Sequence, residues 1–227
     1  MKSRLFTLTF ALGLSLNVQA SDSFFFNTGN VTIPDNDPNG CQDSRDLTGI
    51  SGTISDVEVT LNISGGFNGD LYVWLSHGTG LSILLNRVGV SSSSSVGYGN
   101  TGFGPDAQQN NFTFDDQATQ DVHFYQASSY TLNANGQLTG MWQPDGRILD
   151  PESSASSFDT APRSNLLNVF NGLDPNGEWT LFAADLSSGN ISTLTGWGLV
   201  ITVVPEPSTF ALVGLGTAAL MISRRRK

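Results

Sequence analysis

The chain has 227 residues and a net charge of −10 at pH 7, with ten lysines and arginines against twenty aspartates and glutamates. Six of the cations lie in the terminal segments, so residues 21–204 hold four arginines and nineteen acids, a net charge of −15. Such a surface repels nucleic acids and anionic polymers unless cations intervene. The single cysteine, Cys41, excludes an internal disulfide and leaves a free thiol or an intermolecular link.

The N-terminus has the features of an export signal. Lys2 and Arg4 precede an apolar run over residues 5–16, and Val18-Gln19-Ala20 supplies small residues for cleavage. This pattern predicts a secretory signal peptide over residues 1–20. Residues 21–49, which include three consecutive phenylalanines, are expected to be an N-terminal extension with one added strand and an acidic loop.

The next part of the chain carries alternating apolar runs separated by Gly, Asn, Asp and Ser, which predicts an all-β protein. Residues 57–63 are apolar at every second position, as in a strand with one buried face. Residues 70–76 are apolar on both faces and predict a central strand. A turn at His77-Gly78-Thr79-Gly80 then leads into a hairpin with residues 81–85, and His77 is expected to be solvated there.

A long, weakly patterned stretch follows from residue 89 to about residue 166. A loop of this length is unusual unless it is functional or mobile. His123 within it is expected at a half-exposed strand position. Beyond it, residues 179–184 and 194–203 alternate as two strands, and we expect them to pair with each other and bury Trp179 and Trp197.

The C-terminus combines three features: Pro205-Glu206-Pro207, an uncharged apolar run over residues 210–222, and a basic end. Basic residues hold such an end in the cytoplasm. Thirteen helical residues rise about 20 Å, whereas the hydrocarbon core is about 30 Å thick, so the anchor is weak. One interpretation is an ordinary membrane anchor in which Pro-Glu-Pro occurs by chance. The basic residues are Arg224, Arg225, Arg226 and Lys227.

This arrangement over residues 205–227 closely resembles the PEP-CTERM sorting signal. The resemblance implies transient anchoring in the inner membrane, processing by an exosortase, and a Gram-negative cell that produces exopolysaccharide. It implies a final location in the cell envelope, on the outer surface or in the extracellular matrix.

A second resemblance is to the P domain that follows the catalytic domain of proprotein convertases and many bacterial subtilisin-like proteases. It implies that residues 50–204 form an antiparallel jelly-roll β-sandwich. The chain lacks room for the protease domain, and we find no Gly-x-Ser-x-Gly motif, so we expect no enzymatic activity. The matching blocks are Ile54–Ile63, Asn68–Leu71, Phe114–Ala118, Leu167–Gly172, Asp174–Leu181, Ala184-Asp185 and Ser192–Leu199.

Four aspartates in these blocks are candidate calcium ligands, because calcium prefers oxygen donors and P domains are often stabilised by calcium. They are Asp70, Asp115, Asp116 and Asp185. The alternative is that these carboxylates cap turns through the backbone. One cysteine and two histidines are too few for a zinc site.

Four aromatic residues of the long stretch, Tyr98, Phe103, Tyr125 and Trp142, either stack on sugar rings or form a satellite core. The preferred function is a non-catalytic surface or matrix module that binds a polysaccharide or a protein partner. The alternative is a stand-alone P domain that stabilises or targets a separately encoded subtilisin-like serine protease. A pull-down from envelope extract distinguishes the two.

Overall fold

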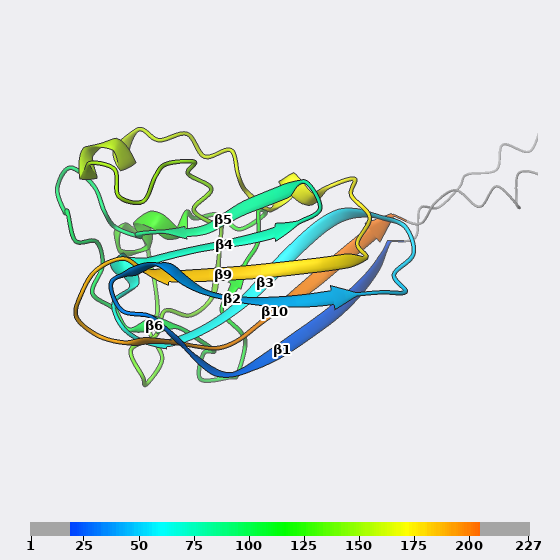
Figure 1. The fold of residues 1–227 in the computed structure, drawn as a ribbon, viewed down its shortest axis with the longest axis horizontal. Helices are drawn as coiled ribbons and strands as arrows, with labels where there is room; N and C mark the ends of the chain where they lie inside the picture. The colour runs from blue at the N-terminus through cyan, green and yellow to red at the C-terminus, as the bar shows by residue number, and fades with distance from the viewer. Residues whose placement is uncertain (1–18, 205–227) are drawn as a thin grey trace, which may run out of the picture.

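Two twisted β-sheets face each other in the computed structural model, which describes residues 19–204 (Figure 1). Six strands form one sheet, in the order β1-β10-β3-β7-β8 with β6 also pairing with β3, and the other sheet has the order β2-β9-β4-β5. The strands are β1 (Ala20–Ile33), β2 (Asp37–Leu47), β3 (Thr53–Gly65), β4 (Leu71–His77), β5 (Gly80–Asn86), β6 (Gly102–Phe103), β7 (Thr113–Phe114), β8 (Met141–Trp142), β9 (Gly177–Asp185) and β10 (Ser192–Val204). Four short 3-10 helices complete the fold: η1 (Asn68–Asp70), η2 (Val122–Ala127), η3 (Ala155–Asp159) and η4 (Leu167–Phe170).

The strand order confirms the prediction of an antiparallel jelly-roll sandwich. The chain passes from β1 in one sheet to β2 in the other and returns with β3, and β9 and β10 again lie in opposite sheets. Jelly rolls arise from such crossings between two packed sheets. The core lies between the sheets, where the alternating side chains of residues 57–63 on β3 are fully buried. The predicted β4–β5 hairpin is also present, with β4 in the interior of its sheet.

Residues 21–49 are more than the extension with one added strand that we expected. They supply β1 to the first sheet and β2 to the second, so both sheets depend on them. Phe26 packs on Trp197, with ring centroids 4.7 Å apart. The strand missed is β2, which carries few apolar residues because it lies at a sheet edge and obtains its pairing from β9.

The expected pairing of the last two strands is wrong. β9 lies between β2 and β4, whereas β10 lies between β1 and β3 in the other sheet. The connection at residues 186–191 therefore crosses from one sheet to the other instead of forming a hairpin. Trp179 and Trp197 are both fully buried, but each packs into the core from its own sheet.

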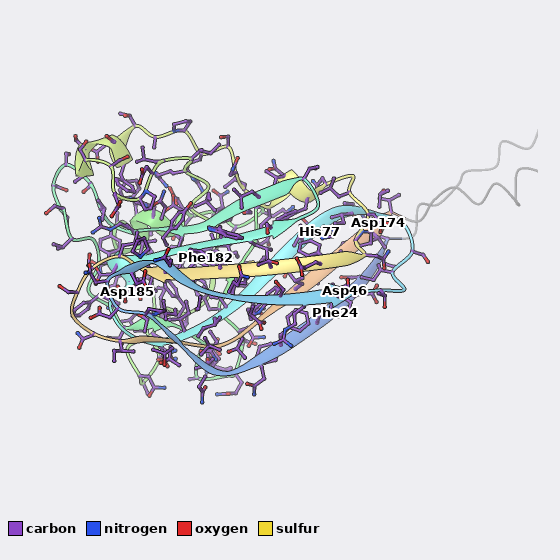
Figure 2. The ribbon with its side chains drawn as sticks, in the orientation of Figure 1. Phe24, Asp46, His77, Asp174, Phe182 and Asp185 are labelled. Carbon is purple, nitrogen blue, oxygen red and sulfur yellow. The ribbon has the colours of Figure 1, made fainter. Side chains whose placement is uncertain are left out.

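The two ends of the domain lie together. Ala20 at the start of β1 is opposite Val203 near the end of β10. At the other end, which we call the distal end, β9 finishes at Asp185 and β10 begins at Ser192 (Figure 2). The thirteen residues of β10 separate these ends by roughly 40 Å at the usual rise of a strand.

The long stretch after β5 is organised by a cluster of buried charges. Asp145 is fully buried and accepts a hydrogen bond from Nδ1 of His123 at 2.6 Å and from Nη1 of Arg147 at 3.1 Å. Arg147 also donates to Asp121 at 2.9 Å. His123 lies in η2 and is fully buried, so the expectation of a half-exposed strand position is wrong. The sequence offers no alternation here, because polar contacts hold this segment.

No helix within residues 19–204 is both long enough and apolar enough to cross a membrane. The predicted sorting helix at residues 210–222 and nearly all of the predicted signal peptide lie outside the described residues.

Candidate ligand pocket at the distal end

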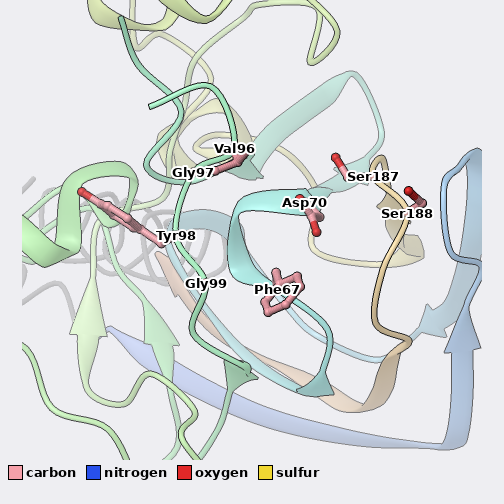
Figure 3. A pocket seen from close by; sticks show the side chains of 8 residues that line it. All are labelled: Phe67, Asp70, Val96, Gly97, Tyr98, Gly99, Ser187 and Ser188. Carbon is pink, nitrogen blue, oxygen red and sulfur yellow. The ribbon is translucent and has the colours of Figure 1, made fainter. Parts of the chain in front are cut away.

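A pocket of about 320 Å³ opens at the distal end, between the start of β4 and two loops (Figure 3). Its volume is at the lower limit of the range typical for small-molecule sites. One loop comprises residues 96–99, and the other contributes Ser187 and Ser188. The side chains of Phe67 and Asp70 come from the segment that leads into β4.

Close backbone packing fixes the position of Asp70. Gly69 donates a hydrogen bond to the carbonyl of Tyr98 at 2.8 Å. A Cβ atom on Gly69 would approach the carbonyl oxygen of Val96 to 2.5 Å, so only glycine allows the loop this close. Asn68 is fully buried and accepts from the backbone N–H of Gly102 at 2.6 Å. The carboxylate is therefore carried by a rigid turn.

The carboxylate of Asp70 is in an unfavourable environment for a negative charge. The residue is only 7% exposed, and Figure 3 shows its side chain directed toward the ring of Phe67. Burial raises the pKa of Asp70, and the charge of Asp35 raises it further, although Ser187 and Arg87 lower it in part. A positively charged or hydrogen-bond-donating ligand would relieve this cost.

A second carboxylate lies behind the pocket. Asp185 is fully buried at the end of β9, where it accepts from the backbone N–H of Ser187 at 3.3 Å and from the Ser192 hydroxyl at 3.2 Å. Burial raises the pKa of Asp185 to about 6, and the charges of Asp70 and Asp35 contribute to this increase. The distal end is therefore strongly acidic.

Arg87 is the cation that faces this acidic group. Its Nε donates to the carbonyl of Gly69 at 3.4 Å, and its Nη2 donates to the hydroxyl of Ser187 at 3.4 Å. Its guanidinium thus binds neutral oxygens and offsets the charge of Asp70 only in part.

The four predicted calcium ligands do not form one site. Asp70 and Asp185 are neighbours, but Asp115 and Asp116 lie near Asp56 instead. No three or more His, Cys, Asp or Glu side chains within residues 19–204 are arranged to hold a metal ion. Asp115 accepts from the backbone N–H of Gln117 at 2.7 Å, as expected for a carboxylate that caps a turn.

Asp116 has a similar local role. It accepts from the backbone N–H groups of Leu167 at 3.0 Å and Asn168 at 2.7 Å, at the start of η4. Because its oxygens satisfy two backbone donors, the alternative of backbone capping explains this residue as well. The four predicted ligands therefore lie in two separate groups, Asp70 with Asp185 and Asp115 with Asp116.

The four predicted sugar-stacking aromatics belong to the core. Phe103 and Tyr125 are fully buried, and Trp142 is 4% exposed. Tyr98 is half-buried, packs edge-to-face on Tyr125 at 4.6 Å, and points away from the pocket in Figure 3. Sequence reasoning missed the pocket aromatic, Phe67, because this residue lies in a glycine-rich turn with no periodic pattern.

Comparison with known proteins gives one clear match at the C-terminus and weak similarity elsewhere. The domain resembles a crystal structure of a serine protease of Aeromonas sobria, with 14% identity and a TM-score of 0.43, over 85% of this chain and 28% of the protease chain. A complex of the Aeromonas sobria serine protease with its chaperone gives 13% identity and a TM-score of 0.41. This similarity covers 86% of this chain and 28% of the chain in the complex. The chain thus spans well under a third of those chains.

No curated protein sequence matches the chain. Residues 203–227 match the PEP-CTERM protein-sorting motif, which confirms the prediction for the C-terminus. The match begins at the last residues of β10 and includes the Pro-Glu-Pro sequence, the apolar run and the basic end. The chain is therefore an exported protein that carries a PEP-CTERM sorting signal.

Proposed function

We propose that this protein is a non-catalytic surface or matrix module that binds an extracellular polysaccharide, and that its distal pocket receives a sugar carrying a protonated amine. The observation that carries the proposal is the carboxylate of Asp70, nine-tenths buried beside Phe67 at a pocket that opens to solvent. An ammonium group would pair with this carboxylate, and the ring would contact the apolar face of the sugar. The net charge of −15 further favours a cationic polymer over an anionic one.

The position of the pocket supports a role in display. The sorting signal follows directly after β10, and the pocket lies roughly 40 Å away at the other end of that strand. The pocket is thus at the end of the domain farther from the point where the tail begins. Exosortase processing would then release the module to the outer surface or the matrix.

The environment of both histidines supports a non-catalytic protein. His123 and Asp145 form a buried pair, but Nε2 of His123 lies 2.9 Å from the carbonyl oxygen of Val90, where a catalytic triad requires a serine. Both ring nitrogens of His77 likewise face backbone carbonyls, of Glu178 and Asp174. Neither ring has a free nitrogen for proton transfer.

Retention of the exported protein on polysaccharide matrices tests the proposal. We expect binding to chitosan, weaker binding to fully acetylated chitin, and none to alginate. Asp70→Asn keeps the shape of the side chain and removes its charge, so it should weaken chitosan binding at least tenfold.

Asp46→Asn is the matched control, because it removes the same charge from an exposed position on β2 at the opposite end (Figure 2). Equal binding of both variants and the unmodified protein would show that overall charge, and not the pocket, attracts the polymer.

A second candidate is a stand-alone P domain that supports a separately encoded subtilisin-like serine protease. The observation in its favour is that the blocks resembling P domains fall on or beside the elements β3, η1, β7, η4, β9 and β10 of the sandwich. Recovery of such a protease from envelope extract, together with no retention on chitosan, would favour this candidate.

A further inference from the structure

A second concavity, of about 530 Å³, lies on the outer face of the six-stranded sheet, away from the distal pocket. Its floor is formed by Asn62 and Ser64 of β3 and Thr195 of β10. Its walls are two turns, at residues 105–109 and 133–137. We call this concavity the amide cleft, because most of its side chains are amides or hydroxyls. It shares no residue with the distal pocket.

Hydrogen bonds hold the walls of the amide cleft in place. The amide nitrogen of Gln137, which is 5% exposed, donates to the carbonyls of Ile63 at 2.8 Å and Phe103 at 3.1 Å. The amide of Asn133 donates to the carbonyl of Pro105 at 2.9 Å and thereby joins the two turns. The cleft is therefore preformed, which lowers the entropy cost of binding.

The one charged side chain of the cleft is occupied by internal contacts. Asp106 accepts from the backbone N–H groups of Gln108 at 2.8 Å and Asn110 at 2.9 Å, and from the Asn110 amide at 2.9 Å. These hydrogen bonds lower the pKa of Asp106. Its carboxylate thus stabilises the turn and has little capacity left for a ligand.

Other polar groups of the cleft remain available. The side chains of Ser64, Gln109 and Asn135 form no hydrogen bond with any residue that the structure describes. Together they present hydroxyl and amide groups that both donate and accept. Pro105, Ala107 and Ala134 supply small apolar surfaces beside them.

We infer that the amide cleft binds an uncharged saccharide. An uncharged set of donors and acceptors on a hydrogen-bonded frame suits ring hydroxyls, and the volume of the cleft lies within the range of small-molecule sites. No cation lines the cleft, and the acidic surface repels anionic sugars. This site is additional to the distal pocket and does not depend on it.

Titration of isotopically labelled protein with cellohexaose, laminarihexaose and maltohexaose, followed by amide chemical shifts, tests the inference. We expect at least one of these neutral oligosaccharides to shift the signals of residues 105–109 and 133–137. The double variant Ser64→Ala/Asn135→Ala should bind it at least tenfold more weakly. Ala134→Arg, which fills the mouth of the cleft, should abolish binding.

Asp70→Asn serves as the control, because it alters the distal pocket alone and should leave binding of the neutral sugar unchanged. If none of the three oligosaccharides shifts these signals, or if the cleft variants bind normally, the inference is overturned. Chitosan retention that depends on Asp70 would still hold in that case, so failure of the cleft and failure of the distal pocket are distinguishable.

Discussion

His77 lies flat against Trp179, with ring centroids 4.0 Å apart and planes 2° from parallel. Its ring nitrogens lie 2.7 Å from the carbonyl oxygen of Asp174 and 2.9 Å from that of Glu178. The residue is only 5% exposed, so the expectation of a solvated turn histidine is wrong. His77 joins the end of β4 to the turn before β9.

Replacement of His77 should therefore destabilise the protein. His77→Ala leaves two carbonyls without their partner and removes the stacking contact, at a cost of about 2–4 kcal/mol. Urea unfolding measures this change. Thr79→Ala, at an exposed position in the adjacent turn, is the control and should change stability by less than about 0.5 kcal/mol. Equal stability of the two variants would show that the contacts of His77 with Trp179 and the two carbonyls do not stabilise the protein.

Asp145 should be the main determinant of acid stability. Burial acts to raise its pKa, but the hydrogen bond from His123 and the charges of His123 and Arg147 outweigh this effect, so the pKa is lowered. The ionised group is thus favoured in the folded protein. The contribution of Asp145 to the free energy of unfolding is complete above the pKa of about 3.9 that the group has in the unfolded chain. This contribution is lost as the pH falls through the lower pKa of the folded protein.

Asp145→Asn should cost about 3–5 kcal/mol at pH 7, because it leaves the buried guanidinium of Arg147 without this counter-charge. Urea unfolding between pH 2 and pH 7 measures the loss of stability and its dependence on pH, because this interval includes the ordinary carboxyl pKa of about 4. The difference between variant and unmodified protein should narrow as the pH falls below about 4. A difference that does not vary with pH would contradict this role.

The contribution of Asp185 to stability should have the opposite pH dependence to that of Asp145. Its pKa is raised to about 6 by burial, so the folded protein holds the proton more tightly than the unfolded chain does. The stability that this proton provides is present below about pH 4 and is lost as pH rises to about 6. Asp185→Asn should therefore stabilise the protein by about 2 kcal/mol at pH 7 and have little effect near pH 4. Thermal unfolding at the two pH values, with Asp46→Asn as the control, tests this sign.

The calcium prediction now depends on Asp70 and Asp185. A ligand that binds only the folded state raises its unfolding midpoint. If calcium binds there, its addition should raise the midpoint and a chelator should reverse the change. Asp185→Asn should abolish the shift, and Asp115→Asn should retain it. An unchanged unfolding midpoint on adding calcium would show that the folded protein does not bind this metal.

The intact mass of the exported protein reports both ends at once. We expect an N-terminus at Ser21, directly after the predicted cleavage site, and a mass that shows removal of the apolar, basic tail. A protein recovered with all 227 residues would contradict both the signal peptide and the sorting signal.

Sequence patterns predicted the parts of the fold in which burial alone determines structure. The alternation over residues 57–63 identified β3, because one face of that strand lies on the core. The strands β4, β9 and β10 were also found from their apolar residues, and all three lie in the interior of their sheets. The polar edge strand β2 was missed, since its structure comes from pairing with β9 and not from its own residues.

The sequence was less informative about the site. It identified Asp70, but it grouped that residue with Asp115 and Asp116, which cap turns elsewhere. It left open whether Tyr125 and Trp142 stack on sugars or form a satellite core, and the long stretch folds back and buries both. Residues distant in the sequence, such as Phe67 and Ser187, meet only through the crossings of the jelly roll.

The pairing of Ser21 with Thr202 also constrains when this domain can fold. β10 follows all the other strands in the sequence, yet it lies inside its sheet, between β1 and β3. That sheet therefore cannot assemble until residues 192–204 are available, and contacts between such distant segments form slowly. A polypeptide that must stay unfolded to be threaded through a secretion channel gains from this delay, because premature compaction is avoided until nearly the whole domain has crossed.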